Sequence, residues 1–268
     1  MSSNKKRIVF KVGTSTLTHK TGKLNLRHLA ELVRVLADLR NAGIEVALVT
    51  SGAIGVGVGK LGLSEKPQDT PGRQAAATIG QCELMFIYDK LFGEYANTIG
   101  QLLITKSDVE DDVRRQNLIN TFEQLFSFGA IPIINENDSV AVDEIVYGDN
   151  DCLSAIVAKL IGADILIILS DVAGLYDANP AEEAQARLIP VVQNINENIL
   201  NLAGGAGSDF GTGGMITKVH AAQIATEAGI SVVITDGSKP SDIYRILAGE
   251  SVGTLFCGKN MTKLEAES

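Results

Sequence analysis

The sequence predicts an α/β protein with a mainly parallel central sheet. Short apolar runs alternate along the chain with segments in which apolar residues recur at helical spacing. One run, residues 164–169, is apolar almost throughout, which is typical of a strand covered by helices on both faces. Parallel strands that follow one another in this way are joined by right-handed crossovers, so helices are expected on both faces of the sheet.

The expected strands are short, and most end in a polar or glycine-containing turn. They cover residues 8–10, 45–49, 100–105, 131–134, 164–169, 231–235 and 253–256. The first helix is expected from Asn25, because leucine and valine residues from Leu26 to Leu39 fall on one face, and Asn41-Ala42-Gly43 ends the pattern. Further helices are expected over residues 73–92, 117–128, 149–161, 197–203, 218–228 and 242–248.

The remaining segments are interpreted as connections. Residues 67–72 are expected to form a loop, and the charged, poorly periodic residues 108–115 a mobile loop near an entrance. Residues 140–147 are expected to form a hairpin, and residues 259–268 a frayed tail. Gly55, Gly57 and Gly59 do not match Gly-x-Gly-x-x-Gly, so they are interpreted as flexibility near a helix end.

Composition restricts the partners. The net charge of -9 and the pI of about 4.9 argue against nucleic acid or an anionic membrane as the main partner. Cys82, Cys152 and Cys257 are widely spaced and odd in number, which favours reduced thiols and a cytoplasmic location. The N-terminus shows no apolar signal region, and no apolar run approaches the ~18 residues of a membrane span.

A polar cluster at the end of a buried strand is the main candidate for a ligand site. The apolar run 131–134 leads directly into Asn135-Glu136-Asn137-Asp138, and a second cluster, Gly148-Asp149-Asn150-Asp151, opens a helix. Ligands of open α/β sheets bind outside the carboxyl ends of the strands, where amides and carboxylates can hold a small polar molecule. A turn with local side-chain caps is the structural alternative for one such cluster, but two clusters around a hairpin favour a binding site.

Three other turns are suited to anionic groups. Lys11-Val12-Gly13-Thr14-Ser15 follows the first strand, and Thr50-Ser51-Gly52-Ala53 lies at a strand-to-helix turn. The glycine-rich stretch 204–214 precedes a helix whose first turn contains Lys218. The segment from Lys11 to Ser15 lacks the glycine spacing of a Walker A motif. Ser51 is not in a nucleophile elbow, because Val49 occupies the position of the first glycine of that motif. His19, His28 and His220 lie outside these motifs and are expected at the surface, and no metal-ligand cluster is visible.

These motifs follow one another along the chain, and together they resemble the motifs of the glutamate 5-kinases of the amino acid kinase family. The resemblance extends from Ile8 to Phe256, and the ordered set is very specific. It implies a three-layer αβα sandwich with a central, mostly parallel eight-stranded sheet. It also implies ATP-dependent phosphorylation of the side-chain carboxylate of L-glutamate, the first step of proline synthesis. A single domain is expected over residues 1–258, with a glutamate-binding lobe to about residue 163 and an ATP-binding lobe after it.

The family roles are carried over residue by residue. Lys11 and Lys218 match lysines that hold phosphates, and Asp151 matches the aspartate that organises them. The substrate-binding positions correspond to Ser51, Gly52, Asp138 and Asn150. The ATP-binding positions correspond to Lys11, Ser170, Asp171, Thr212, Gly213, Gly214, Met215, Ile216, Thr217 and Lys218. Mg²⁺ is expected to be held by ATP oxygens and water, without a protein metal site.

The resemblance also implies partners. Proline is expected as a feedback inhibitor, glutamyl phosphate reductase as a downstream partner, and a dimer or tetramer as the assembly. Many bacterial members carry an extra C-terminal PUA domain, for which this chain is too short, and this puts their tetramer arrangement in doubt here. The alternatives are a kinase of the same fold that acts on acetylglutamate, aspartate or uridylate, and a non-catalytic sensor. Retention of both Lys11 and Lys218 argues against the sensor.

Overall fold

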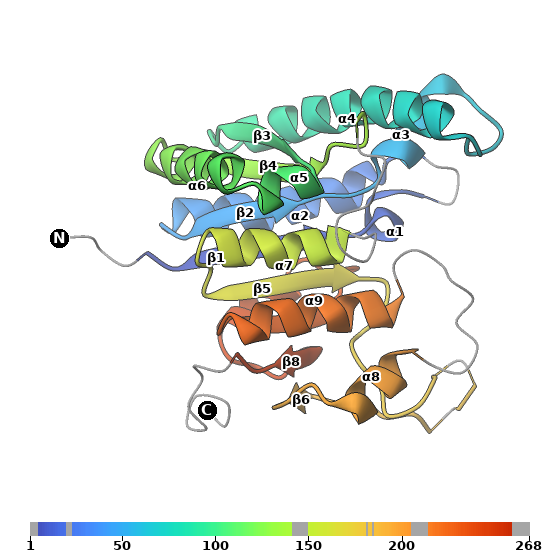
Figure 1. The fold of residues 1–268 in the computed structure, drawn as a ribbon, viewed down its shortest axis with the longest axis vertical. Coiled ribbons are helices and arrows are strands. Elements are labelled where there is room, and N and C mark those ends of the chain that lie inside the picture. The colour runs from blue at the N-terminus through green and yellow to red at the C-terminus, as the bar shows by residue number, and fades with distance from the viewer. Residues whose placement is uncertain are drawn as a thin grey trace.

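The computed structural model describes residues 5–19, 23–140, 150–180, 182–183, 185–204 and 214–258. Within them, eight strands form one sheet in the order β3-β4-β2-β1-β5-β7-β8-β6 (Figure 1). The strands are β1 (Arg7–Val12), β2 (Glu45–Val49), β3 (Ile99–Ile104), β4 (Ile131–Glu136), β5 (Ile165–Ser170), β6 (Val191–Val192), β7 (Ser231–Asp236) and β8 (Thr254–Phe256). The strands from β3 to β7 in this order are all parallel, whereas β8 runs antiparallel to β7 and parallel to β6. The predicted mostly parallel eight-stranded sheet is therefore confirmed.

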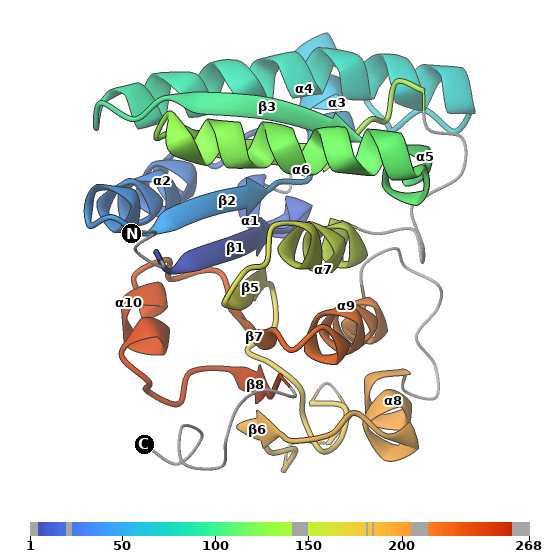
Figure 2. The same ribbon diagram turned by 60° about the vertical axis from the view of Figure 1, so that its left-hand side comes forward.

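Helices cover both faces of the sheet, which gives three layers (Figure 2). One face is covered mainly by α5 (Lys106–Glu110), α6 (Asp112–Ser127), α7 (Asn150–Leu160), α8 (Glu197–Gly204) and α9 (Met215–Glu227). The other face is covered by α1 (Thr14–Leu17), α2 (Leu26–Asn41), α3 (Ala53–Leu61), α4 (Thr70–Gly93) and α10 (Asp242–Leu247). Side chains of β1 alternate between the two layers: Ile8, Phe10 and Val12 pack on the second face, and Val9 packs on the first.

Two predictions about the segment after β3 are wrong. Residues 108–115 do not form a loop, because α5 and α6 follow one another there and α6 begins at Asp112 instead of residue 117. Both helices have strong local caps. The Asp108 carboxylate accepts a hydrogen bond from the Thr105 backbone N–H at 2.8 Å, and Asp111 accepts from the N–H groups of Val113 and Arg114. The charged residues that break the apolar periodicity are thus the residues that begin the helices.

The role expected for Gly57 is also wrong. Gly55 and Gly59 lie in the first and last turns of α3, but Gly57 lies in the middle of this helix, where flexibility near a helix end does not explain it. The reason is the close approach of α4. A Cβ atom on Gly57 would lie 1.8 Å from the Ala76 carbonyl oxygen, and one on Gly80 would lie 1.7 Å from the Ala53 carbonyl oxygen. We call this line of contact the α3–α4 seam.

His28 is a third correction, because it is buried and not a surface residue. It precedes Leu32 and Val35 by four and seven residues and therefore shares the buried face of α2. Burial lowers the pKa of its imidazole, although the carboxylates of Glu31 and Asp236 act in the opposite direction. The two-residue strand β6 was not expected, since so short a segment carries no periodic signal. The predicted tail and all of the predicted hairpin except Val140 lie outside the described residues.

Candidate active site

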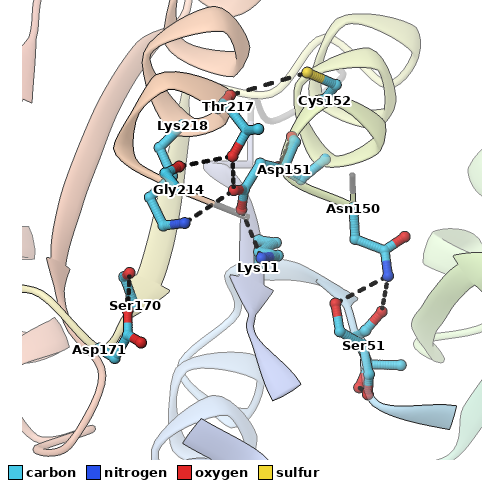
Figure 3. A network of polar contacts seen from close by, with 12 residues as sticks. Lys11, Ser51, Asn150, Asp151, Cys152, Ser170, Asp171, Gly214, Thr217 and Lys218 are labelled. Carbon is cyan, nitrogen blue, oxygen red and sulfur yellow. Dashed lines mark hydrogen bonds and ion pairs between the residues drawn. The ribbon is translucent and has the colours of Figure 1, made fainter. Parts of the chain in front are cut away.

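The predicted site residues gather at the carboxyl ends of the central strands (Figure 3). Lys11 lies near the end of β1, Ser51 follows β2 after one residue, and Ser170 ends β5. Asn150 and Asp151 come from the first turn of α7, and Lys218 from the first turn of α9. Thr212 and Gly213 lie outside the described residues. The site therefore combines the ends of neighbouring parallel strands with two helix N-termini.

A single carboxylate lies between two lysines at the centre of this region. Lys11 Nζ is 2.6 Å from Asp151 Oδ1, and Lys218 Nζ is 3.1 Å from Asp151 Oδ2. The carboxylate is fully buried, and each lysine side chain is 5% exposed. We call these three residues the Lys–Asp–Lys cluster. Its formal charge is +1, so the site keeps an excess of positive charge in a region largely removed from water.

The electrostatics of the cluster keep Asp151 ionised. Burial disfavours the charged carboxylate, but the ammonium groups of Lys11 and Lys218 outweigh burial and hold the pKa of Asp151 below its usual value. Asp151 also lies at the positive end of the α7 dipole. The Thr217 hydroxyl lies 3.0 Å from Asp151 Oδ2 and 2.8 Å from the Gly214 carbonyl oxygen, which ties the start of α9 to the cluster.

Asn150 connects the cluster to the ends of β2 and β4. Its Nδ2 atom lies 3.0 Å from the Thr50 carbonyl oxygen, 2.9 Å from Ser51 Oγ and 3.0 Å from Asn135 Oδ1. Gly52, the next residue along from Ser51, has a φ of 92° and directly precedes α3. This left-handed conformation favours glycine and turns the chain sharply into the helix. Ser51, Gly52 and Asn150 are thus held together, as expected for one binding site.

Asp138 lies on a neighbouring cavity of about 340 Å³. The cavity runs between α4, β3 and the chain that follows β4. It is lined by Ala77, Thr78, Gln81, Cys82, Met85, Gln101, Leu103, Glu136, Asp138 and Ser139. Ser51 and Asn150 do not line it, but Asn135 joins the two parts by accepting from Asn150 and donating to Gln81 at 2.9 Å. The structure therefore places Asp138 beside the Ser51–Asn150 contact but not within it.

The predicted nucleotide-binding residues lie on the other side of β1. Ser170 is buried and its hydroxyl donates to Asp171 Oδ1 at 3.1 Å, while Asp171 itself is exposed. Gly214 directly precedes α9, and Met215 and Ile216 begin this helix and pack against the core. The exposed Asp171 carboxylate, at the end of β5, and the N-terminus of α9 are the two polar features of this part of the site.

Sequence reasoning missed two residues of α4 that reach the site. Gln81 is 7% exposed and contacts Asn135, and Tyr88 is fully buried with its hydroxyl oxygen 2.9 Å from Thr50 Oγ1. Both lie on the apolar face of α4 with Ala77 and Leu84. A glutamine at helical spacing among buried apolar residues is the signal that identifies such a position, because a buried amide needs a partner.

Two further observations concern metals and membranes. No group of three or more His, Cys, Asp or Glu side chains with metal-binding geometry occurs among the residues that the structure describes. Across the same residues, no helix is both long enough and apolar enough to span a membrane. All three cysteines carry free thiols.

Comparison with solved structures identifies the fold. The chain matches a UMP kinase from Bacillus anthracis with a TM-score of 0.62, covering 95% of this chain and 96% of that one, at 16% identity. It matches a carbamate kinase from Giardia lamblia bound to AMP-PNP with a TM-score of 0.64, covering 96% and 99%, also at 16% identity. At this identity the likeness concerns the fold alone.

Comparison of sequences is more specific. The chain is 55% identical to a glutamate 5-kinase of Clostridium acetobutylicum over 96% of this chain and 97% of the relative. It is 51% identical to a glutamate 5-kinase of Listeria monocytogenes over 96% and 94%. A glutamate 5-kinase of Moorella thermoacetica is 53% identical over 95% of this chain, which spans 67% of that relative. The model of the amino acid kinase family matches residues 6–236, and the chain belongs to this family.

Proposed function

We propose that this protein transfers the γ-phosphoryl group of ATP to the side-chain carboxylate of L-glutamate and so forms L-glutamyl 5-phosphate, the first step of proline synthesis. The observation that carries the proposal is the Lys–Asp–Lys cluster, which holds two buried ammonium groups beside the amide of Asn150. Relatives that are 51–55% identical over nearly the whole chain are named glutamate 5-kinases.

The chemistry requires no general base. A glutamate side chain has a pKa near ~4.3 and is already an ionised nucleophile at neutral pH. The protein must therefore position two anions and neutralise the charge on the transferring group. Lys11 and Lys218 would supply that charge, one from β1 and one from α9. Asp151 would hold both ammonium groups in place and would not act as a proton acceptor.

The substrate would be recognised by the polar groups around Asn150. Asn150 Oδ1 is buried and has no hydrogen-bond partner among the described residues, so it can accept from the substrate ammonium. Asp138 would supply the negative charge that pairs with the ammonium, and the Ser51 hydroxyl and the turn at Gly52 would contact the carboxylates. In this arrangement residues up to about 163 form the glutamate-binding lobe, which also supplies Lys11, and residues from 164 to 258 form the ATP-binding lobe.

ATP would lie between Ser170-Asp171 and the start of α9, with its phosphates toward Lys11 and Lys218. Mg²⁺ bound together with ATP would neutralise part of the phosphate charge. The Asp151 carboxylate is occupied by two lysines, whereas the Asp171 residue is exposed and, within the described part of the chain, its carboxylate accepts only from Ser170. Asp171 is thus the better placed of the two to contact the ion or its water shell, with phosphate oxygens as the main ligands.

The proposal is tested by the choice of acceptor. Purified protein is assayed for γ-phosphoryl transfer from ATP to L-glutamate, N-acetylglutamate, aspartate and UMP, with hydroxylamine trapping of any acyl phosphate. Glutamate should be the preferred acceptor. Preference for another acid or for UMP would overturn the assignment, and transfer to none of them would favour a sensor.

The same assay examines regulation, and light scattering examines assembly. We propose that proline inhibits in competition with glutamate, and millimolar proline should therefore raise the glutamate KM. We also propose a cytoplasmic homo-oligomer, which suits the free thiols, and a product that is consumed by glutamyl phosphate reductase. Light scattering gives the oligomer size, and unchanged activity in proline at all glutamate concentrations would remove the inhibitor from the proposal.

A further inference from the structure

Three side-chain amides form a continuous chain from α4 to the candidate substrate site. Asn135 Nδ2 donates to Gln81 Oε1 at 2.9 Å, and Asn150 Nδ2 donates to Asn135 Oδ1 at 3.0 Å. Gln81 and Asn135 are 7% and 2% exposed. The three residues come from α4, β4 and α7, so the chain couples a helix of one layer to a helix of the other across the end of the sheet.

Backbone groups fix the direction of these amides. The Glu136 N–H can only donate, and it lies 2.9 Å from Asn135 Oδ1. The Thr50 carbonyl oxygen can only accept, and it lies 3.0 Å from Asn150 Nδ2. With these two amides fixed, Asn135 Nδ2 needs an acceptor, and Gln81 Oε1 provides it. A flip of any one amide would bring two donors or two acceptors together.

With the three amides oriented in this way, one polar atom remains at each end of the row from Gln81 to Asn150. Asn150 Oδ1 and Gln81 Nε2 are both buried and have no hydrogen-bond partner within the described part of the chain. A buried acceptor without a partner is unfavourable in a folded protein unless a ligand completes it. The amide chain therefore presents an acceptor, and not a donor, at Asn150, next to Ser51.

We propose that Gln81 is a positioning residue that sets the preference of the site for an amino acid. By accepting from Asn135, Gln81 holds Asn135 Oδ1 toward Asn150 and so holds Asn150 Oδ1 ready for the substrate ammonium. This inference rests on the proposed function. Without Gln81, Asn135 Nδ2 loses its acceptor and the Asn135 side chain is held only by the Glu136 N–H, so it can rotate away from Asn150. Asn150 Nδ2 then keeps only its bonds to Thr50 and Ser51, and its amide is held less firmly.

Packing alone does not explain a glutamine at this place. The same face of α4 carries Ala77, Leu84 and Tyr88, all buried, and an apolar side chain of similar length would fit among them. Methionine matches glutamine in length and in helix propensity but cannot accept strongly from Asn135. Gln81→Met therefore removes the hydrogen bond while it keeps the shape.

The first test compares two ligands that differ only in the ammonium group. Gln81→Met should raise the glutamate KM about tenfold, which is the effect of one lost hydrogen bond to a charged group, and should change the ATP KM and kcat less than threefold. Glutarate, which lacks the amino group, should keep its inhibition constant within threefold. Equal weakening of glutamate and glutarate would indicate damage to the pocket and overturn the proposal.

The second test asks whether Gln81 acts through Asn150. In an Asn150→Ala background, Gln81→Met should have little further effect on the glutamate KM, because the two residues then act as one unit. Fully additive effects would overturn the proposal. Met85→Leu is the matched control, since Met85 lies one turn further along α4 and lines the same cavity. If Gln81→Met does not fold, Gln81→Asn, which withdraws the amide by one methylene, replaces it in the same cycle.

Failure of the proposed function can be distinguished from failure of the positioning role of Gln81. A wild-type protein that does not phosphorylate glutamate contradicts the proposed function itself, before any variant is made. Calorimetric binding of glutamate to the wild type and to Gln81→Met then examines the positioning role without turnover. A wild type that binds glutamate about tenfold more tightly than the variant supports the role, and equal binding overturns it.

Discussion

Asp151 contacts both of the lysines on which the proposed chemistry depends. Two ammonium groups this close would repel each other in a buried region, and the carboxylate between them offsets this repulsion and fixes their positions. The free energy that brings the two ammonium groups together is therefore supplied by folding, and the binding of ATP does not have to supply it. Charge arranged in advance in this way stabilises a transition state without reorganisation at the moment of reaction.

The first prediction concerns Lys218. Lys218→Ala should lower kcat by roughly 10²–10³, the usual effect of removing a preorganised charge. Asp151→Asn should also lower kcat, since it keeps the shape of the side chain but releases both lysines. The kcat is measured at saturating ATP and glutamate, so that binding does not contribute. A Lys218→Ala enzyme with a kcat close to that of the wild type would contradict the role of the cluster.

The second prediction separates the two substrates. Asp138→Ala should raise the glutamate KM strongly and leave the ATP KM nearly unchanged, because Asp138 lies on the cavity beside the Ser51–Asn150 contact and away from Ser170. Steady-state kinetics with each substrate varied in turn measures both constants. Similar increases in both KM values would show that Asp138 does not belong to the glutamate site.

The third prediction concerns acid. The folded pKa of Asp151 lies below that of the unfolded chain, so its stabilisation is present above about pH 3.9 and is lost as the pH falls toward the folded pKa. At pH 6–7, Asp151→Asn should lower the free energy of unfolding by about 3–5 kcal/mol, because two buried ammonium groups lose their partner. Below pH 4 the difference from the wild type should narrow. Urea titrations from pH 7 to pH 3 measure it, and a constant difference would refute the assignment.

At the level of elements, the α3–α4 seam sets the position of α3 behind the site. Glycines at positions 57 and 80 let the two helices touch through their backbones. The turn at Ser51 and Gly52 leads directly into α3, and Gln81 and Tyr88 project from α4 toward Asn135 and Thr50. The seam therefore determines how far the substrate-binding turn lies from the helix that supports it.

The fourth prediction tests the seam. Gly57→Ala should lower the free energy of unfolding by about 1–3 kcal/mol or more, because its Cβ would lie 1.8 Å from a backbone oxygen of α4 that cannot move alone. Gly55→Ala is the matched control in the same helix, where the added Cβ would lie 3.8 Å from the Thr14 methyl group and alanine favours the helix. Denaturant unfolding should show a loss for Gly57→Ala and no loss for Gly55→Ala.

The elements were largely predictable because their signal is local. The first helix was expected from Asn25, which caps α2 by accepting from His28 N–H, and the apolar run 164–169 became β5. The errors arose where the cause is distant or is carried by polar residues. Gly57 depends on a helix that begins 13 residues later, and Asp108 and Asp111 begin helices through side-chain hydrogen bonds that periodicity does not register.

The site was predictable only in part. The resemblance supplied Lys11, Asp151 and Lys218, and the structure brings these residues together, although their catalytic roles stay predictions. Gln81 was not identified as a site residue, because its place among the buried apolar residues of α4 indicates only that it needs a partner, and that partner, Asn135, lies on another element. Thr212 and Gly213 lie outside the described residues, so their predicted contacts with ATP also stay predictions.

At the level of the whole molecule, β1 joins the two halves of the sheet. It lies between β2 and β5, and its first residue, Arg7, fixes the end opposite the site. The Arg7 guanidinium lies 2.7 Å from Glu45 and 2.8 Å from Glu123, and it sits 4.5 Å from the centre of the Phe126 ring. The Arg7 N–H also donates to Asp164 at 2.6 Å. One residue thus connects β1, β2, α6 and the start of β5.

The fifth prediction follows from this position. Arg7→Ala should lower the free energy of unfolding by about 1–3 kcal/mol, since Glu45 and a backbone carbonyl oxygen at Ile161 lose a largely buried charged donor. The glutamate and ATP KM values should stay unchanged, because Arg7 lies at the far end of β1. Arg245→Ala is the control, as Arg245 also bonds two carboxylates but is exposed, and it should cause no measurable change.

The central place of β1 has a consequence for the synthesis of the protein on the ribosome. β1 precedes the other described strands along the chain, yet its second neighbour, β5, begins only at Ile165. The 115 residues from 50 to 164 separate the end of β2 from the start of β5. At a translation rate of about 5–20 residues per second, their synthesis takes roughly 6–23 seconds. During this time the nascent chain presents an unpaired strand edge containing Ile8, Val9 and Phe10, which can pair with other chains. The yield of folded protein should therefore depend on the rate at which residues 50–164 are translated.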